Sequence, residues 1–595
     1  MPNPTMYSIT INGVECSVEP GTTIFEAARS IGIEIPSLCR LEGQAPTGAC
    51  RVCVVEVEHA RNLPASCSTP VMDGMVVHTN SARARQARRA VLELLLSEHD
   101  GDCRYCERTN DCELQEIAHA AGIRELRFEG EVAKARVQDT STPALIRDAG
   151  KCIKCRRCVT VCNQIQGVGA LNSQFRGFGI RIGPAFDSPL SQTLCVQCGQ
   201  CAAVCPVGAI VENRHVDGVW AALADPKKHV VVQTAPAIRA ALGECFGMPP
   251  GTRVTGRMCA ALRRLGFNKV FDTNFTADLT ILEEGTELLM RLKSVLHDKK
   301  PAALPQYTSC SPGWISFVEG FYPDIIENIS SCKSPQQMFG ALAKTYYAEV
   351  AGIPAEDIVV VSVMPCTAKK FEAGRPEMNS SGFADVDYVL TTRELGSMIL
   401  EAGIDFPALP DEEMDTPLGL SSGAADIFAN TGGVMEAALR TVHEVVTGRP
   451  LPTADLHVAS IAGLEGVKEA SVTVTDPVAD WAFLDGVEMK FAVAHGLGNA
   501  RKLIERIKSG EAEYHFIEVM TCPGGCIGGG GQPRFTSDDV RRARIAAIYA
   551  EDEGKELRAS HKNPAVASLY KDFLGEPLGH LSHELLHTTY AKRVL

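Results

Sequence analysis

The hydrophobic pattern predicts a small β-rich unit at the start of the chain. Apolar and polar residues alternate over residues 7–18 around Asn12-Gly13, which is typical of a β-hairpin with its turn. Gly21-Thr22-Thr23 then supplies an N-cap for a short helix that ends near Gly32. A basic helix is predicted over residues 81–97 as a connector, with an apolar face of Val91, Leu92, Leu95 and Leu96.

Beyond residue 225 the pattern changes to that of an α/β domain. Short apolar runs, most of them followed by helical segments, predict buried strands at Val230–Gln233, Val270–Asp272, Ile358–Val363, Val386–Leu390, Phe491–Ala494 and Phe516–Val519. A helical tail is predicted from Pro533 to Leu595. The only internal repeat is a pair of cysteine runs that begin at residues 152 and 195.

Length and composition describe a multidomain globular protein. The 595 residues are too many for one hydrophobic core and suggest roughly four domains of about 150 residues. A hydrophobic content of 45% and a charged content of 22% exclude disorder, collagen and coiled coil. No apolar run is long enough to cross a bilayer, and residues 1–6 lack the features of an export signal. The net charge of −14 disfavours nucleic acid or an anionic membrane as a partner, so we expect a soluble, cytoplasmic protein.

The 23 cysteines carry the chemistry of the sequence. A disulfide scaffold is normally a short secreted chain, and no export signal is present here. In a reducing compartment, thiols at fixed short spacings indicate metal ligands. Most of them lie before residue 260, so the metal chemistry is concentrated toward the N-terminus.

The strongest signal is a tandem pair of four-cysteine runs, each with two x2 spacings and one x3 spacing, typical of a two-cluster 4Fe–4S ferredoxin. The runs are Cys152, Cys155, Cys158, Cys162 and Cys195, Cys198, Cys201, Cys205. In such a domain the fourth cysteine of each run completes the other cluster, so Cys205 is expected with the first three and Cys162 with the second three. Two structural zinc ions are the alternative.

A second set of cysteines follows the predicted hairpin and helix. Its members are Cys39, Cys50, Cys53 and Cys67. Their order resembles a plant-type 2Fe–2S ferredoxin domain, although the first gap is longer, and it matches the N-terminal domain of complex I and hydrogenase subunits. Zinc or free thiols are the alternative.

A third set combines one histidine with three cysteines, His99, Cys103, Cys106 and Cys112. By ligand count alone, a zinc site with three thiolates and one imidazole is a serious alternative. The position of the set between two iron–sulfur modules favours a 4Fe–4S cluster with one imidazole ligand.

The fourth set lies in the C-terminal half, in segments 308–314, 364–372 and 518–529. Cys366 and Cys522 each follow a predicted strand, and ligands of open α/β sheets bind at the carboxyl ends of strands. Six glycines between residues 524 and 531 let the backbone approach a bulky inorganic ligand. These features indicate a buried metal centre held by thiolates, with Lys369 and Glu372 nearby to handle anions or protons.

These segments resemble the three signature motifs of FeFe hydrogenases, and the resemblance extends over essentially the whole chain. It is particularly close to the catalytic subunit of multimeric NAD(P)-linked, electron-bifurcating hydrogenases. The resemblance implies an H-cluster, which is a 4Fe–4S cubane bridged by a cysteine to a diiron unit bearing CO, cyanide and azadithiolate.

The resemblance also implies roles for individual residues. Cys366, Cys522 and Cys526 would be cubane ligands, with Cys526 as the bridge. Lys369 would pair with a cyanide. The residues that would line the diiron pocket are Pro236, Ser334, Gln336, Met364 and Met520. The residues that match the family's proton path are Glu284, Glu287 and Ser330.

The first motif departs from the family. It usually has two adjacent cysteines, a proton-relay thiol and then a cubane ligand, whereas here Cys310 is followed by Ser311. In register, Cys310 falls at the relay position and Ser311 at the ligand position. Serine is a hard, weakly acidic donor for iron. Three outcomes stay open: Cys310 ligates and the relay is lost or rerouted, Ser311 ligates weakly, or the cubane is altered or absent.

Pattern and resemblance together predict a multidomain α+β and α/β chain. The expected units are a 2Fe–2S ferredoxin-like β-grasp domain (1–80), a 4Fe–4S domain with one histidine and three cysteine ligands (81–142), a two-cluster 4Fe–4S ferredoxin domain (143–223), a large α/β H-cluster hydrogenase domain (224–540) and a helical C-terminal tail (541–595).

The sequence supports two functional hypotheses. In the first, the chain is an FeFe hydrogenase that interconverts H2 with protons and electrons, and four accessory clusters conduct the electrons. No Gly-x-Gly-x-x-Gly follows a predicted strand, so NAD(P) and FMN are expected on a flavoprotein partner, with a small 2Fe–2S subunit and ferredoxin as further partners. In the second, Ser311 makes the C-terminal domain weak or inactive, and the chain is an electron-relay or sensory subunit of a bifurcating or formate-linked complex.

Overall fold

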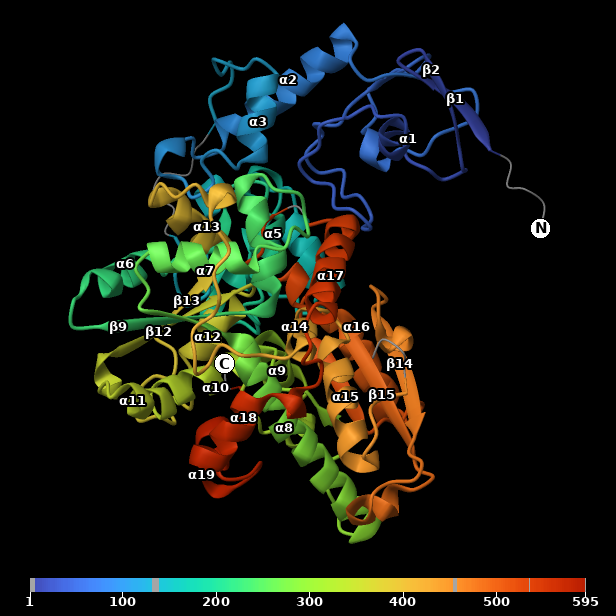
Figure 1. Ribbon diagram of the computed structural model, residues 1–595. Helices are drawn as coiled ribbons and strands as arrows, with labels where there is room; N and C mark the ends of the chain where they lie inside the picture. The colour runs from blue at the N-terminus through green and yellow to red at the C-terminus, as the bar shows by residue number, and fades with distance from the viewer. Residues whose placement is uncertain (1–5, 131–137, 453–456, 535, 594–595) are drawn as a thin grey trace.

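The computed structural model describes residues 6–130, 138–452, 457–534 and 536–593. The chain begins in a small unit set to one side, continues through the long helix α2 (Ala82–Ser97), and ends in a large body built on two sheets (Figure 1). Within the described residues, none of the helices combines the length and hydrophobicity that crossing a bilayer requires.

The N-terminal unit confirms the predicted hairpin and helix. Its elements are β1 (Tyr7–Ile11), β2 (Val14–Val18), α1 (Ile24–Ser30), β3 (Glu56–Val57) and β4 (Val76–His78). Asn12 and Gly13 both have positive φ, at +51° and +83°, and this explains the Asn-Gly pair in the turn. The hydroxyl of Thr23 accepts the Glu26 N–H and so caps α1. The sheet has the order β2-β1-β4-β3.

The predicted connector helix α2 fixes the first unit to the rest of the chain. Leu92 is fully buried, and the other apolar residues of its predicted face pack against the same cluster. The guanidinium of Arg88, also on α2, donates to the carbonyls of Val52, Val54 and Thr79. This places the helix directly against the loop that carries Cys50 and Cys53. A short helix, α3 (Glu113–Ala120), follows.

The next unit contains the two cysteine runs. Its elements are β5 (Leu145–Arg147), α4 (Arg157–Thr160), β6 (Asn172–Gln174), β7 (Arg181–Gly183), α5 (Gln200–Val204) and β8 (Ile210–Glu212). β5 pairs with β8, and β6 pairs with β7, both antiparallel. The sequence repeat is also a repeat of backbone conformation. Lys154 and Arg156 have positive φ in the first loop, and Gln197 and Gly199 have positive φ at the equivalent positions of the second.

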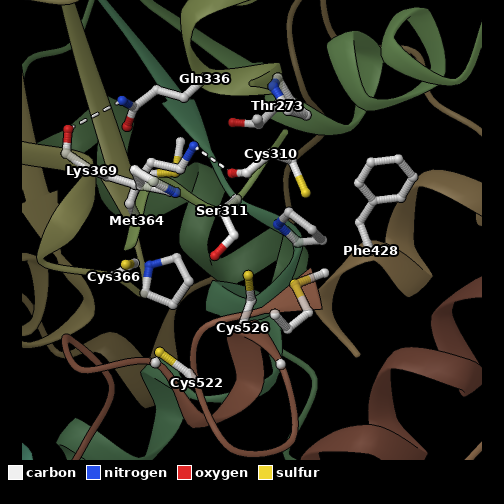
Figure 2. Close-up of a pocket in the computed structure, with 18 of the residues that line it drawn as sticks. Thr273, Cys310, Ser311, Gln336, Met364, Cys366, Lys369, Phe428, Cys522 and Cys526 are labelled. Atoms are coloured by element: carbon white, nitrogen blue, oxygen red, sulfur yellow. Dashed lines mark hydrogen bonds between the residues drawn. The ribbon is translucent and has the colours of Figure 1, made fainter. Parts of the chain in front are cut away.

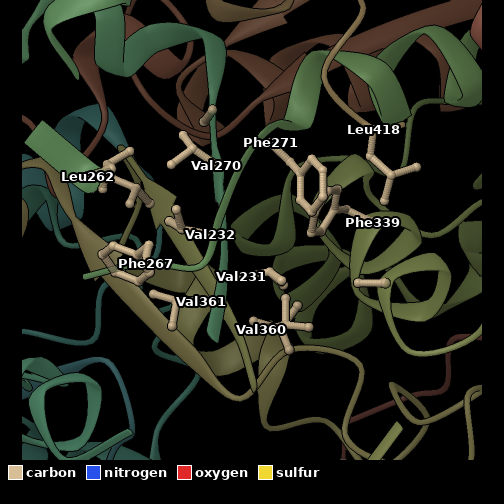
Figure 3. Packing of buried hydrophobic residues seen from close by; sticks show 14 of the residues in the cluster. Val231, Val232, Leu262, Phe267, Val270, Phe271, Phe339, Val360, Val361 and Leu418 are labelled. Atoms are coloured by element: carbon tan, nitrogen blue, oxygen red, sulfur yellow. The ribbon is translucent and has the colours of Figure 1, made fainter. Parts of the chain in front are cut away.

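The large domain has two four-stranded sheets. The first is fully parallel, in the order β10 (Lys269–Asp272), β9 (His229–Thr234), β12 (Ile358–Met364), β13 (Tyr388–Thr391). The second has the order β11 (Gln306–Tyr307), β16 (Phe516–Met520), β15 (Glu488–His495), β14 (Val467–Thr473), with only β14 antiparallel. Valines and aromatic residues on the first sheet and its helices form its core (Figure 3).

All six predicted strands of this domain exist. Five contain the predicted range and extend beyond it, β15 by three residues at its start, and the sixth, β13, is shifted. β13 begins at Tyr388 rather than Val386, because Asp387 leaves the strand and its carboxylate accepts the Val360 N–H at 2.8 Å. The pattern did not predict β11 or β14. β11 has two residues, and β14 is an edge strand whose side chains are mostly exposed or half-buried.

Helix α8 (Thr273–Leu292) belongs to the cores of both sheets. Phe275 and Leu279 pack into the first core, and Ala277 and Ile281 pack into the second. Other helices cover the sheets: α7 (Thr255–Arg264), α9 (Pro312–Phe321), α10 (Pro335–Ala343), α12 (Ala368–Ala373), α13 (Thr392–Glu401), α15 (Gly433–Thr447) and α16 (Leu497–Lys508).

The predicted helical tail is helical only in part. It contains α17 (Asp538–Glu553), α18 (Pro564–Leu569) and α19 (His580–Leu586). After Leu586 the chain is extended, because backbone bonds to the large domain replace helical ones: the Thr588 N–H donates to Ser331 and the Arg593 N–H to Glu319. The last two residues of the predicted tail, 594–595, lie outside the described residues.

Candidate metal centre and electron path

A buried cavity lies where the two sheets of the large domain meet. The space between its lining atoms, including the part open to solvent, is about 730 Å³, and its wall is almost wholly apolar. Residues that follow the carboxyl ends of four parallel strands line it: Ala235 and Pro236 after β9, Cys310 and Ser311 after β11, Pro365 and Cys366 after β12, and Thr521 and Cys522 after β16. The fourth cysteine set therefore lies at the edge where ligands of parallel sheets bind.

Cys366, Cys522 and Cys526 line the same cavity, and their thiols lie around one side of it (Figure 2). The first two are close enough for their thiols to hydrogen-bond to each other. Cys526 comes from the glycine-rich loop, where Gly525 has φ +91° and a Cβ would lie 2.6 Å from the Thr431 nitrogen. Glycine is therefore needed there for the loop to pack closely behind the cysteines.

Ser311 and Cys310 point in different directions. The Ser311 hydroxyl faces the three thiols, whereas the Cys310 thiol points toward Phe428 (Figure 2). The Ser311 Oγ lies 2.7 Å from the hydroxyl of Thr521 and accepts the Thr521 N–H at 3.3 Å. Burial raises the pKa of Cys310 well above its usual range, and the charges of Glu284 and Cys526 act in the same direction.

Lys369 reaches across the cavity. Its ammonium donates to the Cys310 carbonyl at 3.1 Å and to Glu372 at 2.9 Å. Gln336 also lines the cavity, and its Oε1 is buried without a hydrogen-bond partner. An unpartnered polar atom in an apolar cavity, together with three thiols, fits a ligand with both metal and polar character.

Among the predicted pocket residues, Pro236, Gln336, Met364 and Met520 line the cavity. Ser334 is not among the described residues that line it, because its hydroxyl turns away to donate to Glu372 at 2.9 Å. The sequence did not single out several lining residues, namely Ala235, Thr273, Ala277, Phe428 and Thr521. Thr521 lies within one of the three motifs, but Phe428 comes from a segment with no distinctive spacing.

The three residues of the predicted proton path form one hydrogen-bonded group. Ser330 hydrogen-bonds to Glu284, and its hydroxyl donates to Glu287 at 2.6 Å. Glu287 also accepts from Arg291 at 2.7 Å. Burial, with a contribution from the charge of Glu287, raises the pKa of Glu284 to about 8. One Glu284 oxygen is buried without a partner. The group leads from Cys310 toward the partly exposed Glu287.

The structure brings the two cysteine runs together in the predicted crossed arrangement. Cys205 joins the first three cysteines of the first run around a cavity of about 420 Å³, whose thiols are Cys152, Cys155, Cys158 and Cys205. Burial raises the pKa of Cys195 to about 12, and the charge of Cys162 acts in the same direction, so Cys162 lies near the second set.

The donors and spacing of these sets suit iron–sulfur clusters. An iron–sulfur cluster is wider than an ion, so its thiolates stand further apart around a cavity. The fit of clusters therefore rests on the shared cavities and on the all-thiol donor sets.

The loop of the second run lies directly against the cavity of the large domain. Thr367 donates to the Gln197 carbonyl at 2.7 Å, and Gln200 donates to the Gly528 carbonyl at 2.8 Å. Burial raises the pKa of Cys198, and the charge of Cys366 acts in the same direction, so these two thiols lie near each other. This contact gives electrons a short path between the two units.

The cysteines of the two N-terminal sets also lie close together. In the first unit, the thiol of Cys39 hydrogen-bonds to those of Cys50 and Cys67, and Cys53 hydrogen-bonds to Cys67. In the third set, burial raises the pKa values of Cys103 and Cys112, and the charge of Cys106 acts on both in the same direction.

His99 lies beside this third set. Burial lowers its pKa, and its Nδ1 is buried without a hydrogen-bond partner. The charge of Lys151 acts on both His99 and Cys103, so the imidazole and the thiols share one neighbourhood. A neutral imidazole with a free ring nitrogen fits a metal ligand.

Family models match the chain in five consecutive segments. "2Fe-2S iron-sulfur cluster binding domain" matches residues 5–82, "NADH-ubiquinone oxidoreductase-G iron-sulfur binding region" matches 88–127, and "4Fe-4S dicluster domain" matches 151–209. "Iron only hydrogenase large subunit, C-terminal domain" matches 228–530, and "Iron hydrogenase small subunit" matches 538–593. The chain therefore belongs to the iron-only, or FeFe, hydrogenase family and is an oxidoreductase that acts on H2.

Individual relatives agree with this assignment. The chain is 53% identical to the NADP-reducing hydrogenase subunit HndD of Solidesulfovibrio fructosivorans over 99% of both chains. It is 39% identical to iron hydrogenase 1 of Clostridium pasteurianum, over 99% of this chain and 100% of the relative. Among solved structures, the FeFe hydrogenase HydA1 of Chlamydomonas reinhardtii aligns with a TM-score of 0.58 at 46% identity, covering 64% of this chain and 99% of that one. The predicted family and its iron–sulfur domains are confirmed.

Proposed function

We propose that this chain is the catalytic subunit of a cytoplasmic, NAD(P)-linked, electron-bifurcating FeFe hydrogenase. The single observation that carries the proposal is the apolar cavity on which Cys366, Cys522 and Cys526 converge. It lies against the loop of a second cysteine set, so that electrons have a path away from a buried centre. When bound, the H-cluster supplies the iron site at which the H–H bond is broken heterolytically.

The proposed ligands of the cubane are the three cysteines and Ser311. Ser311 rather than Cys310 is proposed for the fourth position because its hydroxyl faces the thiols and accepts the Thr521 N–H at 3.3 Å. A backbone N–H donor favours a negatively charged oxygen, which partly offsets the weak acidity of a serine hydroxyl. Lys369 lies over the same cavity as a cation for an anionic ligand of the diiron unit.

Cys310 and the glutamates are proposed to move the proton. The Cys310 thiol stays protonated because burial raises its pKa well above neutrality, so it can donate and then be reprotonated. Glu284 has a pKa of about 8, close to the value at which a carboxyl both gives and accepts a proton near neutral pH. Ser330 and Glu287 would continue the path to solvent.

The accessory clusters are proposed on the sets assembled above. One 2Fe–2S cluster would be held by the four thiols of the first unit, and one 4Fe–4S cluster by His99 with three cysteines. Two more would occupy the crossed cysteine runs. Because HndD is named as a subunit of an NADP-reducing hydrogenase, an NAD(P)-binding flavoprotein with FMN is the proposed electron partner, together with a small 2Fe–2S subunit and ferredoxin.

The test is H2 uptake by the purified complex after maturation with the diiron cofactor, combined with infrared spectroscopy. Turnover together with CO and cyanide bands is expected. If neither appears, the chain is instead an electron-relay or sensory subunit, the alternative that Ser311 raises.

The position of Ser311 is tested in the full chain produced without the diiron unit, by 57Fe Mössbauer spectroscopy and iron content. We expect Ser311→Ala to lose cubane iron, Ser311→Cys to retain it more firmly, and Cys310→Ala to leave the cubane spectrum unchanged. Loss of cubane iron in Cys310→Ala, with none in Ser311→Ala, would assign the fourth ligand to Cys310.

A further inference from the structure

Two phenylalanines stand out on the surface of the two-cluster unit. Phe175 follows β6 and is 67% exposed, and Phe186 follows β7 and is 93% exposed. Both have positive φ, at +61° and +57°, a backbone conformation that bulky side chains rarely adopt. The Arg181 guanidinium lies 5.9 Å from the centre of the Phe175 ring, and Arg176 is also exposed. We call Phe175, Arg176, Arg181 and Phe186 the hairpin patch.

The hairpin patch lies on the outer side of a wall whose inner side covers four cysteines. Ile182, next to Arg181 on β7, lines the cavity of Cys152, Cys155, Cys158 and Cys205. The Ile182 carbonyl accepts from Arg147, which lines the same cavity. A protein bound to the patch would therefore be separated from this cluster site by little more than one β-hairpin.

The charge of this unit is opposite to that of the whole chain. Residues 138–215 contain eight Lys and Arg but four Asp and Glu, although the chain has a net charge of −14. Asp148 and Glu212 are buried, and Asp139 is half-buried. Asp187, which is exposed, pairs with Arg181 at 2.8 Å. Lys151 and Arg157 are buried as well, and Lys154 and Arg214 pair with Glu98 and Glu107. At the hairpin patch itself, Arg176 and Arg181 lie beside one carboxylate, that of Asp187. The patch therefore carries a net positive charge, and such a surface attracts an acidic partner.

We infer that the hairpin patch docks a small acidic protein that carries a low-potential one-electron centre. The phenylalanines supply apolar contact at the centre of the interface, and the arginines supply orientation and attraction. One electron passes between the carrier and the cluster site of Cys152 and Cys205, so one centre is oxidised as the other is reduced, and no bond is made or broken. This inference rests on the proposed electron chain.

The test uses the matured holoenzyme and an acidic bacterial ferredoxin with two 4Fe–4S clusters as the probe. Phe175→Ser with Phe186→Ser, and separately Arg176→Glu, should each raise the KM for this ferredoxin about tenfold or more with little change in kcat. Binding measured by calorimetry should weaken by the same factor, and the salt dependence of KM should be smaller in Arg176→Glu. The control is Leu400→Ser, which removes a 61% exposed apolar side chain from α13, far from this unit in sequence.

The outcomes separate this inference from the proposed function. If the wild-type enzyme does not turn over H2 even with methyl viologen, the proposed function fails. If it turns over H2 with ferredoxin, and the hairpin-patch variants have wild-type KM and affinity, the docking inference is overturned. It is also overturned if these variants no longer assemble with the other subunits on size-exclusion chromatography, because the patch is then a fixed subunit interface. Iron content equal to that of the wild type shows that the variants are folded.

Discussion

At the scale of single residues, Glu284 differs from its neighbour Glu283. Both are buried on α8. Glu283 accepts from Tyr570 at 2.5 Å and from the Leu578 N–H at 2.8 Å, so the C-terminal tail satisfies it. Glu284 keeps one oxygen without a partner and has a pKa of about 8. A buried carboxyl with a free oxygen and a pKa near neutrality is suited to proton transfer rather than to structure.

Replacement of Glu284 by Gln should lower H2 turnover by about 10²- to 10⁴-fold, the contribution expected of a proton-transfer group. The amide keeps the shape of the side chain but cannot pass a proton along the path to Ser330. The measurement is turnover against pH, with infrared spectra to show that the diiron unit is present. Glu283→Gln is the matched control, and it should lower the thermal stability while turnover is largely retained. Equal losses of turnover in the two variants would argue against the path.

The sequence was informative about residues whose chemistry depends on spacing. The cysteine runs could be paired from their spacing alone, because three thiols on one tight loop can reach only part of a cluster. Ser334 and Thr521 show what residue spacing does not predict, namely the direction of a side chain. Whether a hydroxyl faces the cavity or turns away to Glu372 depends on side-chain rotation and on partners distant in sequence. Phe428 reaches the cavity from a segment that no motif marks.

At the scale of elements, the two cysteine loops share one backbone conformation but carry different residues directly after their second cysteine, where φ is positive. The first has Arg156 with φ +68°, and the second has Gly199 with φ +72°. A Cβ on Gly199 would lie 2.4 Å from the Thr367 hydroxyl, so glycine is required where the loop meets the large domain. In the first loop the corresponding position is occupied by arginine.

Gly199→Ala should therefore separate the loop from the large domain. We expect H2 to reduce the accessory clusters more slowly, as measured by freeze-quench electron paramagnetic resonance. We also expect the free energy of unfolding to fall by about 2–4 kcal/mol because of the clash and the positive φ. Gly177→Ala is the matched control, since Gly177 also has positive φ (+61°) but no atom within 4 Å of its Cβ position. Identical electron-transfer rates in the two variants would contradict this account.

A second element-scale prediction concerns the glycine-rich loop. The Nδ1 of His495 accepts the Gly524 N–H at 3.1 Å, and its Nε2 lies 3.1 Å from the Leu464 carbonyl. Burial lowers its pKa to about 4 from 6.5, so the folded protein holds it neutral. The unfolded chain binds a proton more readily, so its contribution is complete above about pH 6.5 and is lost as the pH falls toward 4, by about 3 kcal/mol in total.

The measurement is the difference in thermal unfolding between about pH 7.5 and about pH 5, which spans most of this window. His495→Asn keeps an acceptor for Gly524 but cannot titrate, so its stability should fall less than that of the wild type over this range. His580→Asn, at an exposed position, should behave like the wild type. A wild-type pH dependence in His495→Asn would mean that another group is responsible.

The hydrophobic pattern predicted the strands whose residues are continuously buried and missed the strands whose residues are not. β9, β12 and β16 are almost wholly buried, and apolar runs predicted all three. β14, with Lys468 and Glu469 among its residues, looks like a loop in sequence, and only its pairing with β15 makes it a strand. The extended end of the tail was predicted as helix because its backbone partners, Ser331 and Glu319, lie in a distant part of the chain.

At the scale of the whole molecule, the units are joined by ion pairs and backbone bonds as well as by apolar contact. Glu212 on β8 of the two-cluster unit pairs with Arg393 on α13 through two contacts of 2.9 Å. Burial opposes this ionisation, but the Arg393 charge dominates and holds the pKa of Glu212 well below its usual range. The C-terminal tail adds a further connection, because it crosses the large domain and reaches the loop of the second cysteine run.

That connection is Arg593, whose guanidinium donates to the Cys195 carbonyl at 2.9 Å. Arg593→Met should free this loop at a cost of about 1.5–3 kcal/mol, the range for a hydrogen bond from a charged donor. The effect on iron retention should exceed the effect on global stability, because Cys195 belongs to the cysteine set nearest the candidate metal centre. We expect faster loss of visible iron–sulfur absorbance on exposure to a chelator, with little change in the unfolding midpoint. Lys592→Met, which removes the neighbouring exposed cation, should lose iron at the wild-type rate. Equal rates in the two variants would show that the tail only covers the large domain and does not secure the electron path.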